Sequence, residues 1–94
     1  MSVYSVTATR RFLRGAKKLH PNTAEATHQA ILKIAENPFV GDRKKADLAD
    51  FYVVKFQALD VEYLIAYSID ELNLKVQLAA IGAHENFYRN LKRN

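Results

Sequence analysis

The pattern of hydrophobic and polar positions changes its period near the middle of the chain. Before residue 38, apolar residues recur at helical spacing in two stretches, at positions 12, 13, 16 and 19 after Thr9, and at positions 26, 30, 31, 34 and 35 after Asn22. This spacing is typical of amphipathic helices. Asn22 and Glu25 resemble a capping pair that starts the second helix. Pro21 separates the stretches and Pro38 ends the second, so they predict an antiparallel helical hairpin.

After residue 50 the apolar positions alternate with a period of two, which is typical of β-strands. Three such stretches, Phe51–Phe56, Val61–Ile69 and Leu74–Ile81, are joined by links of hairpin length. They predict an antiparallel meander. A shorter alternating stretch, Val3–Thr7, predicts a strand before the helices. Residues 39–50 show no sustained period and predict a loop.

Gly82 ends the third stretch of the meander, and Glu85–Lys92 predicts a short C-terminal helix. The element order is therefore β-α-α-β-β-β with a C-terminal helix. Helices that lie together in the sequence cover one face of an antiparallel sheet. The pattern predicts an α+β fold, a helical hairpin on a small antiparallel sheet, and the length of 94 residues fits a single domain over residues 1–94.

Composition excludes several classes of site. The chain has no cysteine, which excludes a disulfide framework and a thiolate metal site. The three histidines lack the spacing of metal ligands, so we expect neither a metal ion nor another cofactor. The N-terminal residues do not resemble a signal peptide, and no apolar run approaches about 18 residues. We therefore expect a soluble, cytoplasmic protein that does not enter a membrane.

The net charge is +4 at pH 7, and the basic residues occur in blocks. An acid-free block lies in the first predicted helix, between Arg10 and Lys18, and we expect this helix to face solvent or a partner. Blocks that folding brings together would bind a polyanion such as nucleic acid, or an acidic protein. Each block by itself is equally typical of a solvated surface. Two further blocks, in the loop and in the C-terminal segment, are Arg43, Lys44 and Lys45, and Arg89, Lys92 and Arg93.

With this element order, the chain resembles the RelE/ParE superfamily of toxins from bacterial type II toxin–antitoxin systems. The resemblance rests on the basic first helix, on KKADLADFYVVKF (44–56), on EYLIAYSI (62–69) and on LAAIGAHENFYRNLKR (78–93). It implies a cognate antitoxin as partner. RelE-like members cut messenger RNA on the ribosome, whereas ParE-like members poison DNA gyrase. A degenerate module that only binds its antitoxin is a third possibility.

The C-terminal segment favours the RNA-cleaving branch, an endoribonuclease with ribosome and mRNA as partners. RNA cleavage without a metal ion needs a group that transfers protons and cations that stabilise charge on the phosphate. His84 is the candidate for proton transfer, because imidazole titrates near neutral pH. Tyr88, one helical turn later, would orient a phosphate or stack on a base. The alternative is that His84 only ends the last strand.

Lys55 is the third catalytic candidate, because it interrupts an otherwise apolar strand. A lysine at the edge of a sheet also prevents aggregation, which is the alternative explanation. Phe87 and Leu91 are expected to pack in the core. The candidates for RNA binding are Lys44, Lys45, Arg89, Lys92 and Arg93.

One position departs from the RelE-like pattern. Members commonly carry an arginine in the middle strand, in a pattern like Tyr-Arg-Leu-Ile-Tyr, and this arginine holds the scissile phosphate. Leu64 occupies the matching position here. Either another cation, such as Lys55 or Arg89, supplies the phosphate contact, or the chain does not cut RNA in the usual way. If Leu64 lies outside the core, Leu64→Arg is expected to raise activity.

Overall fold

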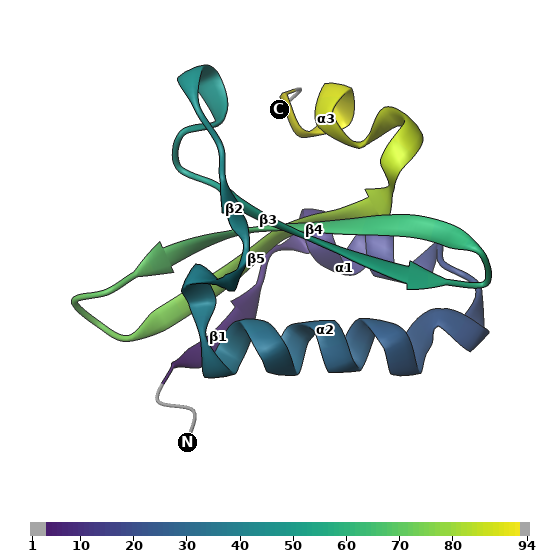
Figure 1. Cartoon of the computed structure of the whole chain (residues 1–94), viewed down its shortest axis with the longest axis horizontal. Coiled ribbons are helices and arrows are strands. Elements are labelled where there is room, and N and C mark those ends of the chain that lie inside the picture. Colours follow the sequence, from purple (N-terminus) through teal and green to yellow (C-terminus); the bar gives the residue numbers. More distant parts are fainter. Residues whose placement is uncertain (1–3, 93–94) are drawn as a thin grey trace.

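The computed structural model describes residues 4–92, and in this part of the chain a five-stranded sheet separates α1 and α2 from α3 (Figure 1). The helices are α1 (Arg10–Lys17), α2 (Ala24–Glu36) and α3 (His84–Lys92). The strands, in their spatial order, are β1 (Ser5–Ala8), β5 (Lys75–Ala83), β4 (Val61–Asp70), β3 (Tyr52–Ala58) and β2 (Asp42–Arg43). No helix within residues 4–92 is long and apolar enough to cross a membrane.

The α+β class and the antiparallel meander are confirmed, since β4 pairs antiparallel with both β3 and β5. The sheet also gains a strand at each edge. β1 pairs with β5 in parallel, so the complete sheet is mixed. β2 pairs antiparallel with β3 and lies within the segment that the sequence predicted to be a loop. That segment is more ordered than predicted because its backbone groups find partners at the sheet edge, as in the 2.9 Å bond from Lys44 N–H to the Phe51 carbonyl.

The helical hairpin is confirmed, but its second helix starts later than predicted. α2 begins at Ala24, after a short 3-10 turn over Pro21–Thr23. Because Asn22 lies inside this turn, the predicted capping pair of Asn22 and Glu25 is wrong. The turn is capped instead by His20, whose Nδ1 accepts a 3.0 Å hydrogen bond from the Asn22 N–H. The ring of His20 therefore has a structural role that its sequence position did not reveal.

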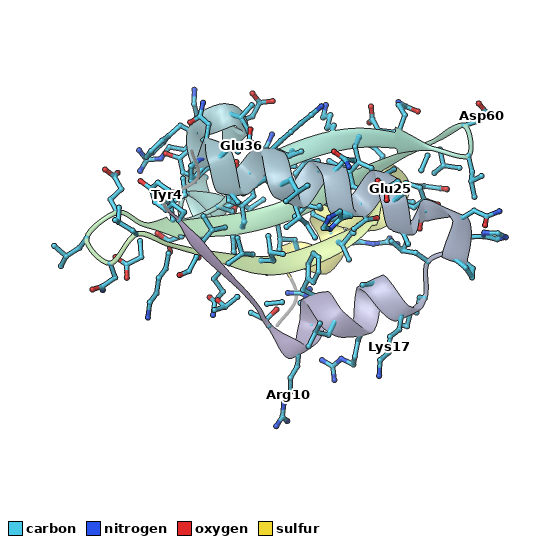
Figure 2. All side chains as sticks on the ribbon, turned by 90° about the horizontal axis from the view of Figure 1, so that it is seen from below. Tyr4, Arg10, Lys17, Glu25, Glu36 and Asp60 are labelled. Carbon is cyan, nitrogen blue, oxygen red and sulfur yellow. The ribbon has the colours of Figure 1, made fainter. Side chains whose placement is uncertain are left out.

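Two hydrophobic clusters lie on opposite faces of the sheet. Because side chains alternate along a strand, β4 sends Ile65 and Tyr67 to the face of α1 and α2, and Leu64 and Ala66 to the face of α3. Figure 2 shows the first face, with α1 and α2 in front of the sheet. The first cluster comprises Phe12, Ala30, Ile34, Ile65, Tyr67, Val76, Leu78 and Ile81. The second, hereafter the α3 cluster, comprises Leu48, Val53, Leu64, Ala66, Ala80, Phe87 and Leu91.

Tyr67 anchors the segment that follows α2 to the sheet. Its buried hydroxyl donates a 2.6 Å hydrogen bond to the Pro38 carbonyl and accepts one of 3.1 Å from the Gly41 N–H. A Cβ atom at Gly41 would lie 2.5 Å from this hydroxyl oxygen, so the close approach requires glycine. The ring of Tyr52 stacks on that of Tyr67, with centroids 5.9 Å apart. These contacts fix the backbone at Pro38–Gly41, directly before β2 at the edge of the sheet.

The buried phenol of Tyr67 predicts a loss of stability at alkaline pH. Burial raises the pKa of Tyr67 from 10.0 to about 12. Above pH 10 the unfolded chain loses this proton first, so the free energy of unfolding falls as pH rises from about 10 towards 12. The free energy of unfolding is expected to fall by about 3 kcal/mol, because the pKa differs by two between the folded and unfolded chain. Urea denaturation between pH 8 and 12 measures it, and an equally steep decline in Tyr67→Phe would assign the effect to other groups.

Candidate functional site

The junction of β5 and α3 places His84 opposite a carboxylate. His84 is the first residue of α3, and the pairing of Tyr63 with Ala83 brings Glu62 to the neighbouring position of β4. Glu62 Oε1 lies 3.9 Å from His84 Nε2, and the two side chains are 37% and 54% exposed. Solvent reaches this pair and screens the interaction between the two groups. Both groups remain open to a substrate.

Tyr88 lies beside His84, as the helical spacing predicted. Their ring centroids are 6.3 Å apart, in an edge-to-face arrangement. The Phe87 ring also lies edge-to-face with the Tyr88 ring, with their centroids 5.4 Å apart. Phe87 is only 5% exposed and belongs to the α3 cluster, so its predicted core position is confirmed. The half-buried Tyr88 ring is therefore held between the core and the exposed surface of His84.

Lys44 reaches this surface from a distant part of the sequence. Its Nζ atom lies 5.2 Å from the centroid of the Tyr88 ring, within the range of a cation–π contact. The segment that carries Lys44 is held on one side by β2 and on the other by the 3-10 turn Ala46–Leu48, whose Leu48 is buried in the α3 cluster. The loop predicted by the sequence thus supplies one of the predicted cations. Lys45, the next residue, is exposed before this turn.

Lys55 lies on β3, on the face of the sheet that α3 covers. It is the cross-strand partner of Leu64, and such partners have Cβ atoms about 5 Å apart. Lys55 is exposed, whereas Leu64 is 0% exposed beneath α3. The position at which RelE-like toxins carry an arginine is thus part of the core here. The condition under which Leu64→Arg was expected to raise activity is therefore not met, because the new charge would be buried.

The remaining predicted cations are Arg89, Lys92 and Arg93. Arg89 is exposed and follows Tyr88 directly. Lys92 is the last residue of α3, but its side chain and all of Arg93 lie outside the described residues. Among the residues that the structure describes, no group of three or more His, Asp or Glu side chains is placed to hold a metal ion.

Glu62 is the residue that sequence reasoning missed. Its only signal in the sequence is a carboxylate at the start of the apolar stretch EYLIAYSI. Its position opposite His84 follows from the pairing of β4 with β5, which a single sequence does not specify. We use the name β5–α3 site for the group of Glu62, His84, Tyr88 and Lys44.

A family model for the ParE-like toxin of type II bacterial toxin–antitoxin systems matches residues 6–92. The chain belongs to this family. The match spans every helix of the fold and nearly all of the first strand, so it covers both sides of the β5–α3 site. The resemblance inferred from the sequence is thereby confirmed at the level of the superfamily. A comparison with curated proteins gives no significant match.

Solved RelE structures share the fold of this ParE-like toxin. A chain of the RelBE toxin–antitoxin complex of E. coli matches with a TM-score of 0.72 and 20% identity, covering 88% of this chain and 99% of that one. The isolated E. coli RelE toxin matches with a TM-score of 0.71 and 20% identity, covering 97% of this chain and 98% of that one. A chain of the RelBE2 complex from Mycobacterium tuberculosis matches with a TM-score of 0.76 and 22% identity, covering 86% of this chain and 98% of that one. Identities this low establish the fold and leave the chemistry to this chain's own residues.

The burial of Leu64 predicts that Leu64→Arg destabilises the toxin instead of activating it. The arginine would replace a fully buried side chain in the cluster that contains Phe87 and Leu91. We expect a loss of at least about 3 kcal/mol in the free energy of unfolding, since a buried unpaired charge is among the costliest substitutions. Leu64→Met, which conserves volume, should lose less than about 1.5 kcal/mol. Urea denaturation tests both, and a stable, more active Leu64→Arg toxin would contradict the assignment.

Proposed function

We propose that this ParE-like toxin is an endoribonuclease that cuts messenger RNA on the ribosome and so stops translation. The observation that supports this proposal is the convergence in the β5–α3 site. His84 faces the Glu62 carboxylate at 3.9 Å and the Tyr88 ring, and Lys44 lies over that same ring. A proton-transfer group, an aromatic ring and a cation therefore share one exposed surface. Metal-free RNA cleavage requires a proton-transfer group and a cation, and the aromatic ring suits contact with a base.

The proposed reaction starts at the 2′-hydroxyl group next to the scissile phosphate. Neutral His84 takes the hydroxyl proton, and the imidazolium that forms is stabilised by Glu62 at 3.9 Å. The 2′-oxygen forms a bond to phosphorus while the bond from phosphorus to the 5′-oxygen breaks. The departing oxygen takes a proton from water, which reaches this site because His84 is largely exposed. The products are a 2′,3′-cyclic phosphate and a 5′-hydroxyl end.

Cations compensate the charge that develops on the phosphate during this reaction. Lys44 and Lys55 are the candidates on the same face of the sheet, the first over Tyr88 and the second beside the buried Leu64. Because Leu64 presents no charge, Lys55 is the strand cation that lies nearest to the usual arginine position. Tyr88 presents a ring edge and a hydroxyl group, which suit contact with a base or a phosphate oxygen.

A cognate antitoxin is the second part of the proposal. It is supported by the family, whose description names a toxin–antitoxin system, and by the RelBE complexes among the similar structures. An antitoxin that covers the β5–α3 site would block access of RNA to His84. The proposed targets, ribosome and mRNA, place the free toxin in the cytoplasm.

Brief induction of the toxin in growing cells is expected to produce new 5′-hydroxyl ends inside translated transcripts. His84→Ala should lose these ends and the growth arrest, with a rate at least about 10²-fold lower, because loss of a general acid–base group typically costs this much. Glu62→Gln should lower the rate by a smaller factor, since it removes only the charge beside the imidazole. Mapping of RNA ends at matched protein levels, with circular dichroism as the test of folding, measures both effects.

Two outcomes would contradict the nuclease proposal. Intact transcripts together with double-strand breaks in the chromosome would assign the toxin to DNA gyrase, the alternative that the sequence left open. A folded His84→Ala variant that cuts as fast as the unaltered toxin would remove His84 from the reaction and leave it with only a structural role at the junction of β5 and α3.

Charge reversal at Lys55 tests the assignment of the phosphate contact. Lys55→Glu is expected to slow cleavage at least about 10-fold, because it replaces an attractive charge near the phosphate with a repulsive one. Lys17→Glu is the matched control, since Lys17 is exposed on α1 and points away from the sheet (Figure 2). The two variants carry the same net charge, so equal rates would show that Lys55 is only part of a solvated surface.

A further inference from the structure

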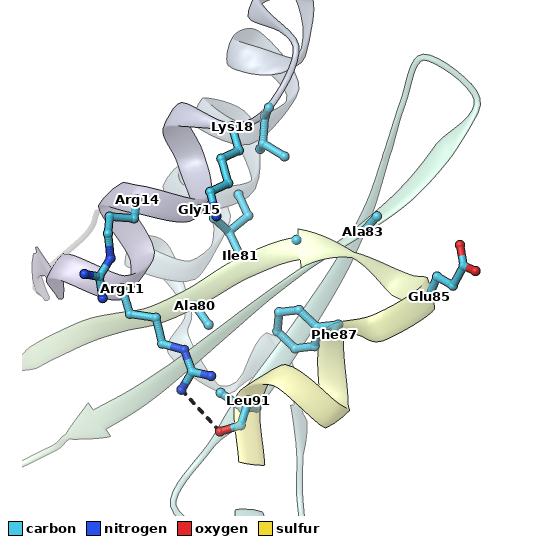
Figure 3. Close-up of a pocket in the computed structure, with 12 residues that line it drawn as sticks. Arg11, Arg14, Gly15, Lys18, Ala80, Ile81, Ala83, Glu85, Phe87 and Leu91 are labelled. Atoms are coloured by element: carbon cyan, nitrogen blue, oxygen red, sulfur yellow. Dashed lines mark hydrogen bonds between the residues drawn. The ribbon is translucent and has the colours of Figure 1, made fainter. Parts of the chain in front are cut away.

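A groove of about 470 Å³ lies between α1 and α3 (Figure 3). Its α1 wall carries three basic residues, Arg11, Arg14 and Lys18. Phe87 and Leu91 of α3 form the opposite wall. Arg11 reaches across one end of the groove, where its guanidinium group donates a 3.3 Å hydrogen bond to the Leu91 carbonyl. The three basic side chains are separated by a helical turn each, so they follow one line along α1.

The charged groups that line this groove are mainly cationic. Its apolar lining is already used in the core, since Ile81, Phe87 and Leu91 are 8%, 5% and 4% exposed. Arg14 and Lys18, by contrast, are exposed. A polyanion gains affinity from the charges themselves.

The groove leads to the β5–α3 site. Gly82, Ala83 and Glu85 line its far end, and His84 lies between the last two residues in the sequence. Glu85 supplies the one acidic group in the lining, and its carboxylate points away from α1 (Figure 3). RNA bound at His84 would therefore lie next to this end of the groove, whose α1 wall carries the line of basic residues.

We propose that the groove between α1 and α3 binds the phosphate backbone of the single-stranded RNA that continues beyond the cleaved bond. This inference rests on the proposed function and adds a second contact region to it. Arg14 and Lys18 are the binding residues, while Arg11 closes the end of the groove and holds the last turn of α3. The line from Arg11 to Lys18 extends for about 10 Å along the helix, which is long enough for more than one phosphate. RNA length therefore contributes to affinity.

The test measures binding of labelled RNA to the His84→Ala toxin by fluorescence anisotropy, so that no strand is cut. The probes are a single strand of about eight nucleotides, a length typical of small single-strand binding domains, and a trinucleotide. The variant is Arg14→Gln/Lys18→Gln. It should weaken binding of the long strand several-fold and lower the slope of log K against log salt by about 1.4, from two phosphate contacts. Binding of the trinucleotide should remain unchanged.

The matched control is Arg10→Gln/Lys17→Gln, which removes the same residue types and the same charge from the same helix. Arg10 and Lys17 do not line the groove, and both point away from the sheet (Figure 2). This control should leave binding of both probes nearly unchanged. Thermal unfolding of each variant establishes that the fold is intact.

Three results would overturn the proposal. Equal weakening by the two double variants would show an effect of net charge alone. Failure of the His84→Ala toxin to bind the long strand even at low salt would exclude a binding groove. A variant that keeps RNA binding but no longer forms a complex with the antitoxin would make the groove a protein interface. Cleavage is tested separately by mapping RNA ends, so a toxin that cuts RNA but fails this test refutes only the groove.

Discussion

The packing of α3 on β4 is the constraint on which the rest of this structure depends. β4 is buried on both faces, and Leu64 lies wholly beneath Phe87 and Leu91 of α3. This apolar contact sets the position and rotation of the helix on the sheet. His84 and Tyr88 occupy the same short helix, so the geometry of the β5–α3 site follows from packing that lies under it. A helix of nine residues would be marginal without such support.

The same packing explains why the candidate site is arranged around α3 and not beneath it. A side chain at position 64 cannot both fill the α3 cluster and present a charge to a phosphate. In this chain it fills the cluster, and the neighbouring strand position carries the exposed Lys55. Further cations lie near α3, Lys44 over the Tyr88 ring and Arg14 and Lys18 along the groove between α1 and α3. Basic side chains therefore approach α3 from two parts of the chain, the segment that carries Lys44 and helix α1.

Lys44 depends on an anchor on the opposite face of the sheet. The Tyr67 hydroxyl binds the backbone at Pro38 and Gly41, and three residues later the chain has passed the sheet edge. Pairing of β2 with β3 then directs Lys44 toward Tyr88. Buried polar groups that are fully hydrogen-bonded favour one arrangement of a segment, because the alternatives leave these groups unpaired. The position of one cation therefore depends on contacts in both cores.

The sequence by itself determined the features that depend on neighbours a few residues away. Helical and alternating periods predicted the hairpin and the meander, and a spacing of four residues predicted that Tyr88 lies beside His84. The tertiary structure decided the features that depend on strand register and long-range packing. These are the parallel pairing of β1 with β5, the carboxylate of Glu62 opposite His84, the approach of Lys44, and the burial of Leu64. A period shows which residues share a face of one element, but only the packed chain decides which elements meet across that face.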